Sequence, residues 1–269
     1  MSGPIGIFDS GIGGLTVARA ACELLKDESI LYYGDTAHLP YGEKSPELIR
    51  KYSARIVKHL VSSGCKAIVV ACNSASSNAL ETVKEIAADI PVIDMVTPVV
   101  AELIEEFNDG AKIGLIGTRA TISSGLYSKS IAALSSDKHT IEVQTRATPL
   151  LASAIEEGFY NNTIPGAVLE AYLGDGHFND VDAMILGCTH YPIVSNEVKE
   201  LLPKHVHVID SPAIIAKHLM SELEKRGLLN NESLVTSNCF QVSDLTETFR
   251  FGAQKFFGAG LDLEEVVLG

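Results

Sequence analysis

The sequence predicts an α/β protein built as two similar halves, each with a mainly parallel sheet flanked by helices. Short apolar runs rich in β-branched residues alternate with helical patterns from one end of the chain to the other, which is typical of βαβ units. The second half also repeats features of the first half at matching positions. The sequence therefore predicts two similar halves, each built from βαβ units.

The first series of elements fills residues 5–108. The predicted strands are 5–8, 30–33, 67–71 and 91–93. The predicted helices are 12–26, 46–63, 74–88 and 97–108. A parallel sheet follows from this order, because a helix crosses over between successive strands.

A second series follows it, with helices between and after its strands. The predicted strands are 112–116, 141–144, 182–186 and 206–209. A last strand at 239–242 and a helix at 245–257 most simply return to the first sheet and complete it. We therefore assign residues 1–97 and 210–269 to a first, discontinuous domain and residues 98–209 to a second.

The clearest evidence for the internal repeat is the spacing of two cysteines. Cys72 and Cys188 are separated by the same number of residues as the tripeptides Val92-Ile93-Asp94 and Val208-Ile209-Asp210. Such agreement favours a duplication that brings one cysteine to the end of a strand in each half. A chance match remains the alternative, because Val-Ile-Asp is a common tripeptide.

Composition limits the kinds of partner. The 269 residues are 46% hydrophobic and 20% charged, as in ordinary soluble globular proteins. With 21 Lys and Arg against 34 Asp and Glu, the net charge is −13, which argues against binding to nucleic acid or an anionic membrane. No targeting segment or membrane-length apolar run is present, so we expect a cytoplasmic protein.

The five cysteines point to free thiols. Their odd number, wide spacing and lack of a Cys-x-x-Cys pair fit neither a disulfide framework nor a zinc site, and we expect no bound metal. A free cysteine usually serves as a small buried hydrophobic residue. We interpret Cys22, Cys65 and Cys239 in this way. Cys72 and Cys188 differ, because each stands at a predicted strand end and is followed by polar residues.

A pair of thiols at strand ends is suited to acid and base work. Amides at a helix start favour thiolate over thiol, so each cysteine is expected to have a lowered pKa. His190 beside Cys188 is compatible with a Cys-His nucleophile, but that interpretation leaves Cys72 without a role. Inversion at a carbon uses both groups, since one removes a proton from one face and the other returns a proton to the opposite face. With no pyridoxal or metal motif evident, a cofactor-free racemase follows.

A glycine-rich loop after the first strand is a candidate anion site. In 9–15 the backbone amides and Ser10 can hold a carboxylate or phosphate. The loop departs from the dinucleotide fingerprint at Thr16, and a nicotinamide site with Asp35 on the ribose leaves the cysteines idle. The structural alternative is a tight turn with Ser10 as a helix cap. The turn 40–42 can similarly present a tyrosine hydroxyl and backbone amides to a ligand. The alternative is that this turn has a structural role alone.

Several motifs together make the chain resemble the bacterial glutamate racemase family over nearly its whole length. They are Asp9-Ser10-Gly-x-Gly-Gly, Pro40-Tyr41-Gly42, Ala71-Cys72-Asn73-Ser74-Ala75, Gly117-Thr118-x-Ala-Thr121-Ile and Leu186-Gly187-Cys188-Thr189-His190-Tyr191. The resemblance implies conversion between L- and D-glutamate without a cofactor, which supplies D-glutamate for peptidoglycan. It also implies an active site in the cleft between two α/β domains, and a homodimer.

The resemblance further implies roles for individual residues. Cys72 would deprotonate D-glutamate and Cys188 would deprotonate L-glutamate. Asp9 and His190 would assist them, with Asp35 and Glu156 as further helpers, although Glu156 can equally be a solvated helix charge. The residues expected to bind substrate are Asp9, Ser10, Pro40, Tyr41, Gly42, Cys72, Asn73, Ser74, Thr118, Thr121, Cys188, Thr189 and His190.

The chain departs from the family pattern in places. Ser74 replaces the commoner threonine, Thr97 stands where many members have glutamate, and Thr148 lacks a frequent preceding cysteine. Because the chain starts just before its first strand, we expect no activation by a cell-wall precursor. Two alternatives remain: a racemase for aspartate or another amino acid, and a non-catalytic regulatory relative such as a gyrase inhibitor.

Overall fold

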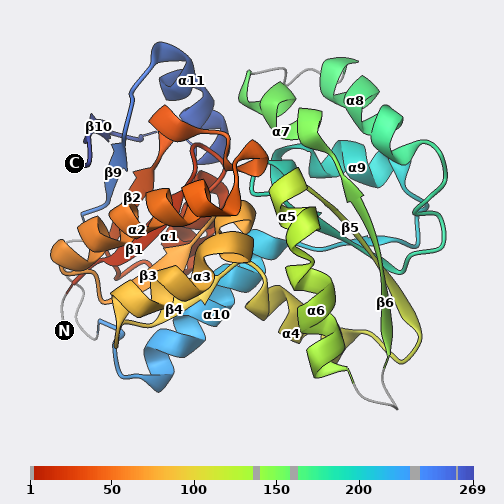
Figure 1. Cartoon of the computed structure of the whole chain (residues 1–269), viewed down its shortest axis with the longest axis horizontal. Coiled ribbons are helices and arrows are strands. Elements are labelled where there is room, and N and C mark those ends of the chain that lie inside the picture. Colours follow the sequence, from red (N-terminus) through yellow and green to blue (C-terminus); the bar gives the residue numbers. More distant parts are fainter. Residues whose placement is uncertain (1–2, 136–139, 158–162, 231–236, 259) are drawn as a thin grey trace.

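A computed structural model describes the chain except residues 1–2, 136–139, 158–162, 231–236 and 259. It contains a six-stranded sheet in the order β10-β9-β2-β1-β3-β4 and a four-stranded sheet in the order β6-β5-β7-β8. Every described strand pairing is parallel. Helices flank both sheets (Figure 1), which confirms the predicted fold class.

The six-stranded sheet draws its strands from both ends of the chain. They are β1 (Ile5–Asp9), β2 (Ile30–Gly34), β3 (Ala67–Val70), β4 (Val92–Asp94), β9 (Cys239–Val242) and β10 (Leu263–Glu265). Its helices are α1 (Leu15–Leu24), α2 (Pro46–Ser62), α3 (Asn73–Ala87), α10 (Ser211–Lys225) and α11 (Glu247–Phe256), with short 3-10 turns η1 (Thr36–His38) and η2 (Tyr41–Glu43). The strands β1, β2 and β3 are buried throughout, as expected for a sheet covered on both faces.

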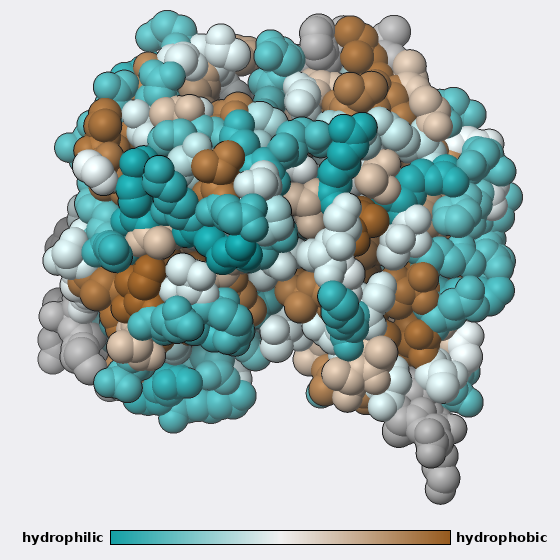
Figure 2. All heavy atoms as spheres, viewed as in Figure 1, coloured by the Kyte–Doolittle hydropathy of each residue, from teal (hydrophilic) through white to brown (hydrophobic). Residues whose placement is uncertain are grey.

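The four-stranded sheet is continuous in sequence. Its strands are β5 (Ala111–Gly117), β6 (Ile141–Ala147), β7 (Ala183–Gly187) and β8 (His207–Val208). Its helices are α4 (Thr97–Glu106), α5 (Arg119–Ser124), α6 (Leu126–Leu134), α7 (Pro149–Glu156), α8 (Thr163–Leu173) and α9 (Ser195–Leu201), with the turn η3 (Tyr191–Val194). Two lobes lie side by side, and a notch separates them at the lower edge of Figure 2.

The strand order supports the predicted internal repeat. In the first sheet β1 lies between β2 and β3, with β4 beyond β3, and in the second sheet β5 lies between β6 and β7, with β8 beyond β7. The strands β3 and β7, which precede the two cysteines, therefore hold equivalent places. Strand β9 pairs with β2 and so returns to the first sheet as expected.

The exact domain boundaries remain a prediction. Strands of the first sheet lie within 5–94 and 239–265, and strands of the second lie within 111–208. Strand β10 was not predicted, because Leu263–Glu265 is short and mostly exposed at the edge of the sheet. Within the described residues, no helix is both long and apolar enough to cross a bilayer.

Candidate active site

The Cys72 side chain lies at the carboxyl end of β3, where the chain turns into α3. Its extended backbone (φ −139°, ψ 118°) places it at the N-cap of that helix, and only 4% of the residue is exposed. The thiol donates to Ser10 Oγ over 3.7 Å. Ser10 follows β1, the neighbouring strand, so the parallel sheet brings these two side chains together.

The Asp9 carboxylate lies beside this thiol and is fully buried. Its Oδ2 accepts hydrogen bonds from the backbone amides of Gly11 (3.1 Å) and Gly14 (2.9 Å), and Ser10 Oγ donates to Oδ1 over 3.5 Å. Burial raises the pKa of Asp9, which the charge on His190 and the amide hydrogen bonds oppose. The glycine-rich loop thus holds a carboxylate of the protein, through amides that were expected to hold a ligand.

The expected lowering of the Cys72 pKa is wrong for the structure as it stands. Burial raises the pKa of this thiol, and the negative charge of Asp9 raises it further. The Ala75 amide and Ser10 lower it, but by less. Amides at the helix start do reach the sulfur, as predicted, yet desolvation of a charge outweighs them. Without substrate, Cys72 is therefore a protonated thiol.

Cys188 follows β7 and has a different neighbour. The residue is 6% exposed, and its Sγ lies in hydrogen-bond contact with His190 Nδ1 at 3.5 Å. The other ring nitrogen, Nε2, lies 2.7 Å from Oε1 of Glu156 at the end of α7. Burial lowers the pKa of His190, but Glu156, a negatively charged Cys188 and their hydrogen bonds together hold it well above its usual value. The imidazole is therefore a cation.

The two cysteine motifs meet at one place. A charge on Cys188 raises the pKa of Cys72, and the charge on His190 acts on Asp9. The glycine loop also packs against the second motif, since a Cβ at Gly13 would lie 2.4 Å from Thr189 Oγ1 and 2.5 Å from His190 Nδ1. Only glycine permits so close an approach of the two halves here.

Asn73 offers a free donor at this place. The residue is 2% exposed, and its Oδ1 accepts a hydrogen bond from the Tyr127 hydroxyl over 2.7 Å. Its Nδ2 is buried and has no hydrogen-bond partner among the described residues. A buried amide donor without a partner is costly, so the geometry favours a ligand oxygen at this position.

Three hydroxyls from the two halves form a cluster close by. Thr118 Oγ1 lies 2.9 Å from Ser74 Oγ and 3.0 Å from Thr121 Oγ1. Thr118 also caps α5 by accepting from the Thr121 amide. The Cβ of an alanine at Gly42 would lie 2.7 Å from Thr118 Cβ, so the turn 40–42 reaches this cluster through its glycine. Hydroxyls of this kind suit a carboxylate or an ammonium group.

Asp35 is placed in a separate network. Its Oδ2 accepts from Tyr41 Oη over 2.6 Å, and its Oδ1 is 2.8 Å from His38 Nδ1 and accepts from Ser243 Oγ over 3.0 Å. Within the described part of the chain, no hydrogen bond joins Asp35 to either cysteine. The Tyr41 hydroxyl is thus directed at Asp35, and a role of either group in the reaction stays a prediction.

The sequence analysis missed Tyr127. Tyr127 is 1% exposed on α6, and a buried aromatic residue on a helix normally signals core packing. No pattern of the sequence indicates that its hydroxyl reaches Asn73.

Among the described residues, no three His, Cys, Asp or Glu side chains gather as metal ligands would.

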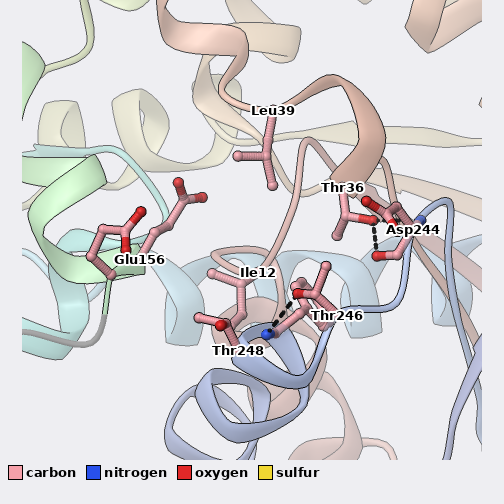
Figure 3. Close-up of a pocket in the computed structure, with 9 residues that line it drawn as sticks. Ile12, Thr36, Leu39, Glu156, Asp244, Thr246 and Thr248 are labelled. Carbon is pink, nitrogen blue, oxygen red and sulfur yellow. Dashed lines mark hydrogen bonds between the residues drawn. The ribbon is translucent and has the colours of Figure 1, made fainter.

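A cavity of about 320 Å³ opens beside the Glu156 carboxylate (Figure 3). The residues that line it are Ile12, Thr36, Leu39, Glu156, Glu157, Asp244, Thr246, Thr248 and Phe249. Neither cysteine is among them. Glu156 therefore joins the buried Cys188 and His190 pair to an open space at the surface.

Comparison with known proteins gives one consistent result. The family model for Asp/Glu/hydantoin racemases matches residues 15–219. A protein named glutamate racemase from Chlorobaculum parvum is 41% identical over 98% of this chain and 96% of its own length. The crystal structure of glutamate racemase from Francisella tularensis in complex with D-glutamate is 38% identical, with a TM-score of 0.90 over 98% of this chain and 97% of that one. The Thermus thermophilus glutamate racemase, in complex with beta-chloro-D-alanine, is 37% identical with a TM-score of 0.86 over 99% and 98% of the two chains.

Proposed function

The chain belongs to the Asp/Glu/hydantoin racemase family, and on that premise we propose that it interconverts L- and D-glutamate without a cofactor. The observation that carries the proposal is the convergence of two buried thiols from equivalent strands. Each has its own acid or base partner, Asp9 with Ser10 for Cys72 and His190 for Cys188. Exchange of a proton between opposite faces of one carbon needs such a pair.

The proposed reaction moves two protons and no other atoms. With L-glutamate bound, the Cys188 thiolate removes the α-proton and becomes a thiol. The Cys72 thiol delivers its proton to the opposite face and becomes a thiolate, which leaves D-glutamate in the site. In the reverse direction, Cys72 removes the proton and Cys188 returns one. Because each sulfur must serve as both acid and base, neither can be dispensed with.

The charge states in the structure favour the direction that begins with L-glutamate. The raised pKa of Cys72 keeps a proton on the sulfur that must donate one. His190, whose pKa is held well above its usual value, lies 3.5 Å from the Cys188 sulfur, which must accept one. The free enzyme is thus prepared to act on the L-enantiomer first.

Substrate binding is assigned to polar groups without a basic side chain. We place the α-carboxylate or side-chain carboxylate of glutamate against Asn73 Nδ2 and the hydroxyl cluster of Ser74, Thr118 and Thr121. Ser10 and Thr189, which flank the two thiols, complete the site. Charge-assisted hydrogen bonds from neutral donors are strong where water is excluded.

Isotope incorporation tests the reaction. Each enantiomer of glutamate and of aspartate is incubated with the protein in deuterium oxide, and both optical rotation and α-deuterium are followed. We expect racemisation of glutamate with one solvent deuterium at the α-carbon of the product. Incorporation into aspartate alone would indicate a racemase for that amino acid, and no incorporation into any of the four would indicate a non-catalytic binding protein.

We also propose that the protein works as a homodimer in the cytoplasm and supplies D-glutamate for peptidoglycan. These points rest on the family resemblance. Light scattering on the purified protein tests the dimer. Growth of a depleted strain with and without added D-glutamate tests the supply of the cell wall, because external D-glutamate should restore growth.

A further inference from the structure

We propose that Thr16 is a positioning residue for Cys188, on which it acts across the two lobes through the backbone carbonyl of Thr189. Thr16 is the residue at which the glycine-rich loop departs from the dinucleotide fingerprint, and the proposed reaction gives it no role. It lies on α1 of the first lobe, whereas Thr189 follows β7 of the second. The inference rests on the proposed racemase function and adds a residue to it.

The Thr16 hydroxyl donates to two carbonyls that belong to different lobes. Its Oγ1 lies 2.9 Å from the Gly13 oxygen and 3.3 Å from the Thr189 oxygen, so its one proton is shared between them. The Gly13 oxygen also accepts from the backbone amide of Thr16 over 3.1 Å. Gly13 therefore keeps a hydrogen bond even without the hydroxyl.

The Thr189 carbonyl has no such second donor. In a 3-10 turn a carbonyl accepts from the amide three residues later, but that residue here is Pro192, which has no N–H. The next amide, that of Ile193, donates to the His190 carbonyl over 3.2 Å. Thr189 is buried, and among the hydrogen bonds of the described residues only that of Thr16 reaches its carbonyl. A buried carbonyl without a donor is costly, so Thr16 determines where this peptide group lies.

The peptide group that Thr16 holds separates the sulfur from its imidazole neighbour. Its carbonyl belongs to Thr189, with Cys188 directly before and His190 directly after, and Cys188 Sγ lies 3.5 Å from His190 Nδ1. Rotation of this peptide group would displace the sulfur relative to the ring and to the glycine-rich loop of the first lobe. Proton transfer to and from a substrate held between the lobes depends strongly on such displacements. Thr16 therefore fixes the position from which Cys188 acts.

The equivalent place in the second lobe lacks this contact. Ser124 follows β5, the counterpart of β1, and donates to the carbonyl three residues before it, that of Thr121, over 2.7 Å. Thr16 donates to Gly13 in the same way. Within the part of the chain that the structure describes, no hydrogen bond joins the Ser124 side chain to the other lobe. The bond across the lobes is thus specific to the Cys188 side.

Two substitutions of Thr16 separate the hydroxyl from the shape of the side chain. Thr16→Val removes the hydroxyl at nearly constant shape, and we expect a several-fold loss of kcat/KM, equal in both directions because the enantiomers have equal free energy. With α-deuterated substrates, the primary isotope effect should rise for L-glutamate, whose proton goes to Cys188, and not for D-glutamate. A purely structural role would lower the amount of folded enzyme without this asymmetry. Thr16→Ser keeps the hydroxyl and should behave as the wild type.

Ser124→Ala is the matched control, because it removes only the equivalent bond within one lobe. Both isotope effects should be unchanged in this variant. Hydrogen exchange of the Tyr191 amide, which donates to the Cys188 carbonyl over 3.1 Å, gives a measurement that needs no activity. This exchange should become faster in Thr16→Val and stay unchanged in Thr16→Ser and Ser124→Ala.

Four results would overturn the inference. They are wild-type kcat/KM in Thr16→Val, equal changes in the two isotope effects, the same losses in Thr16→Ser, and unchanged exchange of the Tyr191 amide in Thr16→Val. A wild type that does not racemise glutamate would instead refute the proposed function. The exchange rates would still test the bond in that case, so the two failures are told apart.

Discussion

The surroundings of the two cysteines differ, although the strands that carry them hold equivalent places in the two sheets. Cys72 faces a buried carboxylate through Ser10, and Cys188 faces a cationic imidazole. A negative neighbour favours the thiol and a positive neighbour favours the thiolate. The repeated topology therefore supplies two sulfurs in matching positions, while the side chains around them differ in charge: a carboxylate lies near Cys72 and an imidazole near Cys188.

This difference matters because a racemase needs one acid and one base at every moment. Two thiols in identical surroundings would have equal pKa values, and a single proton would lie on either sulfur equally often. Unequal surroundings make the two arrangements of that proton unequal in free energy. Substitutions that alter the surroundings of one cysteine and leave those of the other intact test the importance of this difference.

Loss of either sulfur should have the largest effect. We expect Cys72→Ser and Cys188→Ser each to lower kcat/KM by about 10²-fold or more in both directions, because a serine hydroxyl is a far weaker acid and base at neutral pH. Polarimetry from each enantiomer measures this. Cys239→Ser is the control. Cys239 is a free thiol on β9, which pairs with the edge strand β10, so its replacement should leave activity unchanged. Near-full activity in either active-site variant would refute the two-base account.

Two adjacent glycines allow the surroundings of one cysteine to be disturbed at a time. A Cβ at Gly13 would lie 2.5 Å from His190 Nδ1, and a Cβ at Gly14 would lie 2.5 Å from Asp9 Cβ. We expect each alanine variant to lower kcat/KM by about tenfold or more, since displaced acid and base groups transfer protons poorly. Because enantiomers have equal free energy, kcat/KM must fall equally in both directions.

The isotope effect distinguishes the two glycine variants. With α-deuterated substrates, Gly13→Ala should increase the primary isotope effect more for L-glutamate, whose proton goes to Cys188. Gly14→Ala should increase it more for D-glutamate, whose proton goes to Cys72. The same change for both enantiomers in both variants would show that the two sides are not independent.

The charge of Asp9 should be visible in the titration of Cys72. Since this charge raises the pKa of the thiol, Asp9→Asn should move the midpoint of Cys72 alkylation by iodoacetamide to lower pH, by about one unit. Mass spectrometry of the labelled peptide across a pH series measures the midpoint. Asp35→Asn is the control, because Asp35 is bonded to Tyr41, His38 and Ser243, and a similar shift in that variant would contradict the assignment.

The smallest effect is expected for a hydroxyl that orients the substrate amide. Tyr127→Phe frees the Asn73 amide to rotate, at a cost of about 1 kcal/mol or a factor of about five in KM for glutamate, with little change in kcat. Tyr33→Phe removes a hydroxyl that donates to the Val266 carbonyl, away from the thiols, and should leave KM unchanged. Equal KM values in the two variants would assign Tyr127 to packing alone.

The repeated parts of the molecule were the easiest to predict from the sequence. Buried parallel strands have continuous apolar runs, and their carboxyl ends face one edge, so Cys72 and Cys188 could be assigned to a common site. The sequence also indicated a pairing of Cys188 with His190, although neighbouring residues on a turn need not touch, and the structure shows that they do.

Contacts between distant segments were harder. The pairing of His190 with Glu156 depends on where α7 ends, and the pairing of Asn73 with Tyr127 depends on how the two lobes pack. The direction of the Cys72 pKa was missed for a related reason. Helix amides can be expected from sequence, but the opposing effect of desolvation depends on how deeply the thiol is buried.

A structure of the protein with D-glutamate bound tests the central claim most directly. The account predicts the Cys72 and Cys188 sulfurs on opposite faces of the α-carbon, each about 3–4 Å from it, as near-attack geometry requires. Two sulfurs on the same face, or a substrate bound away from either of them, would contradict it.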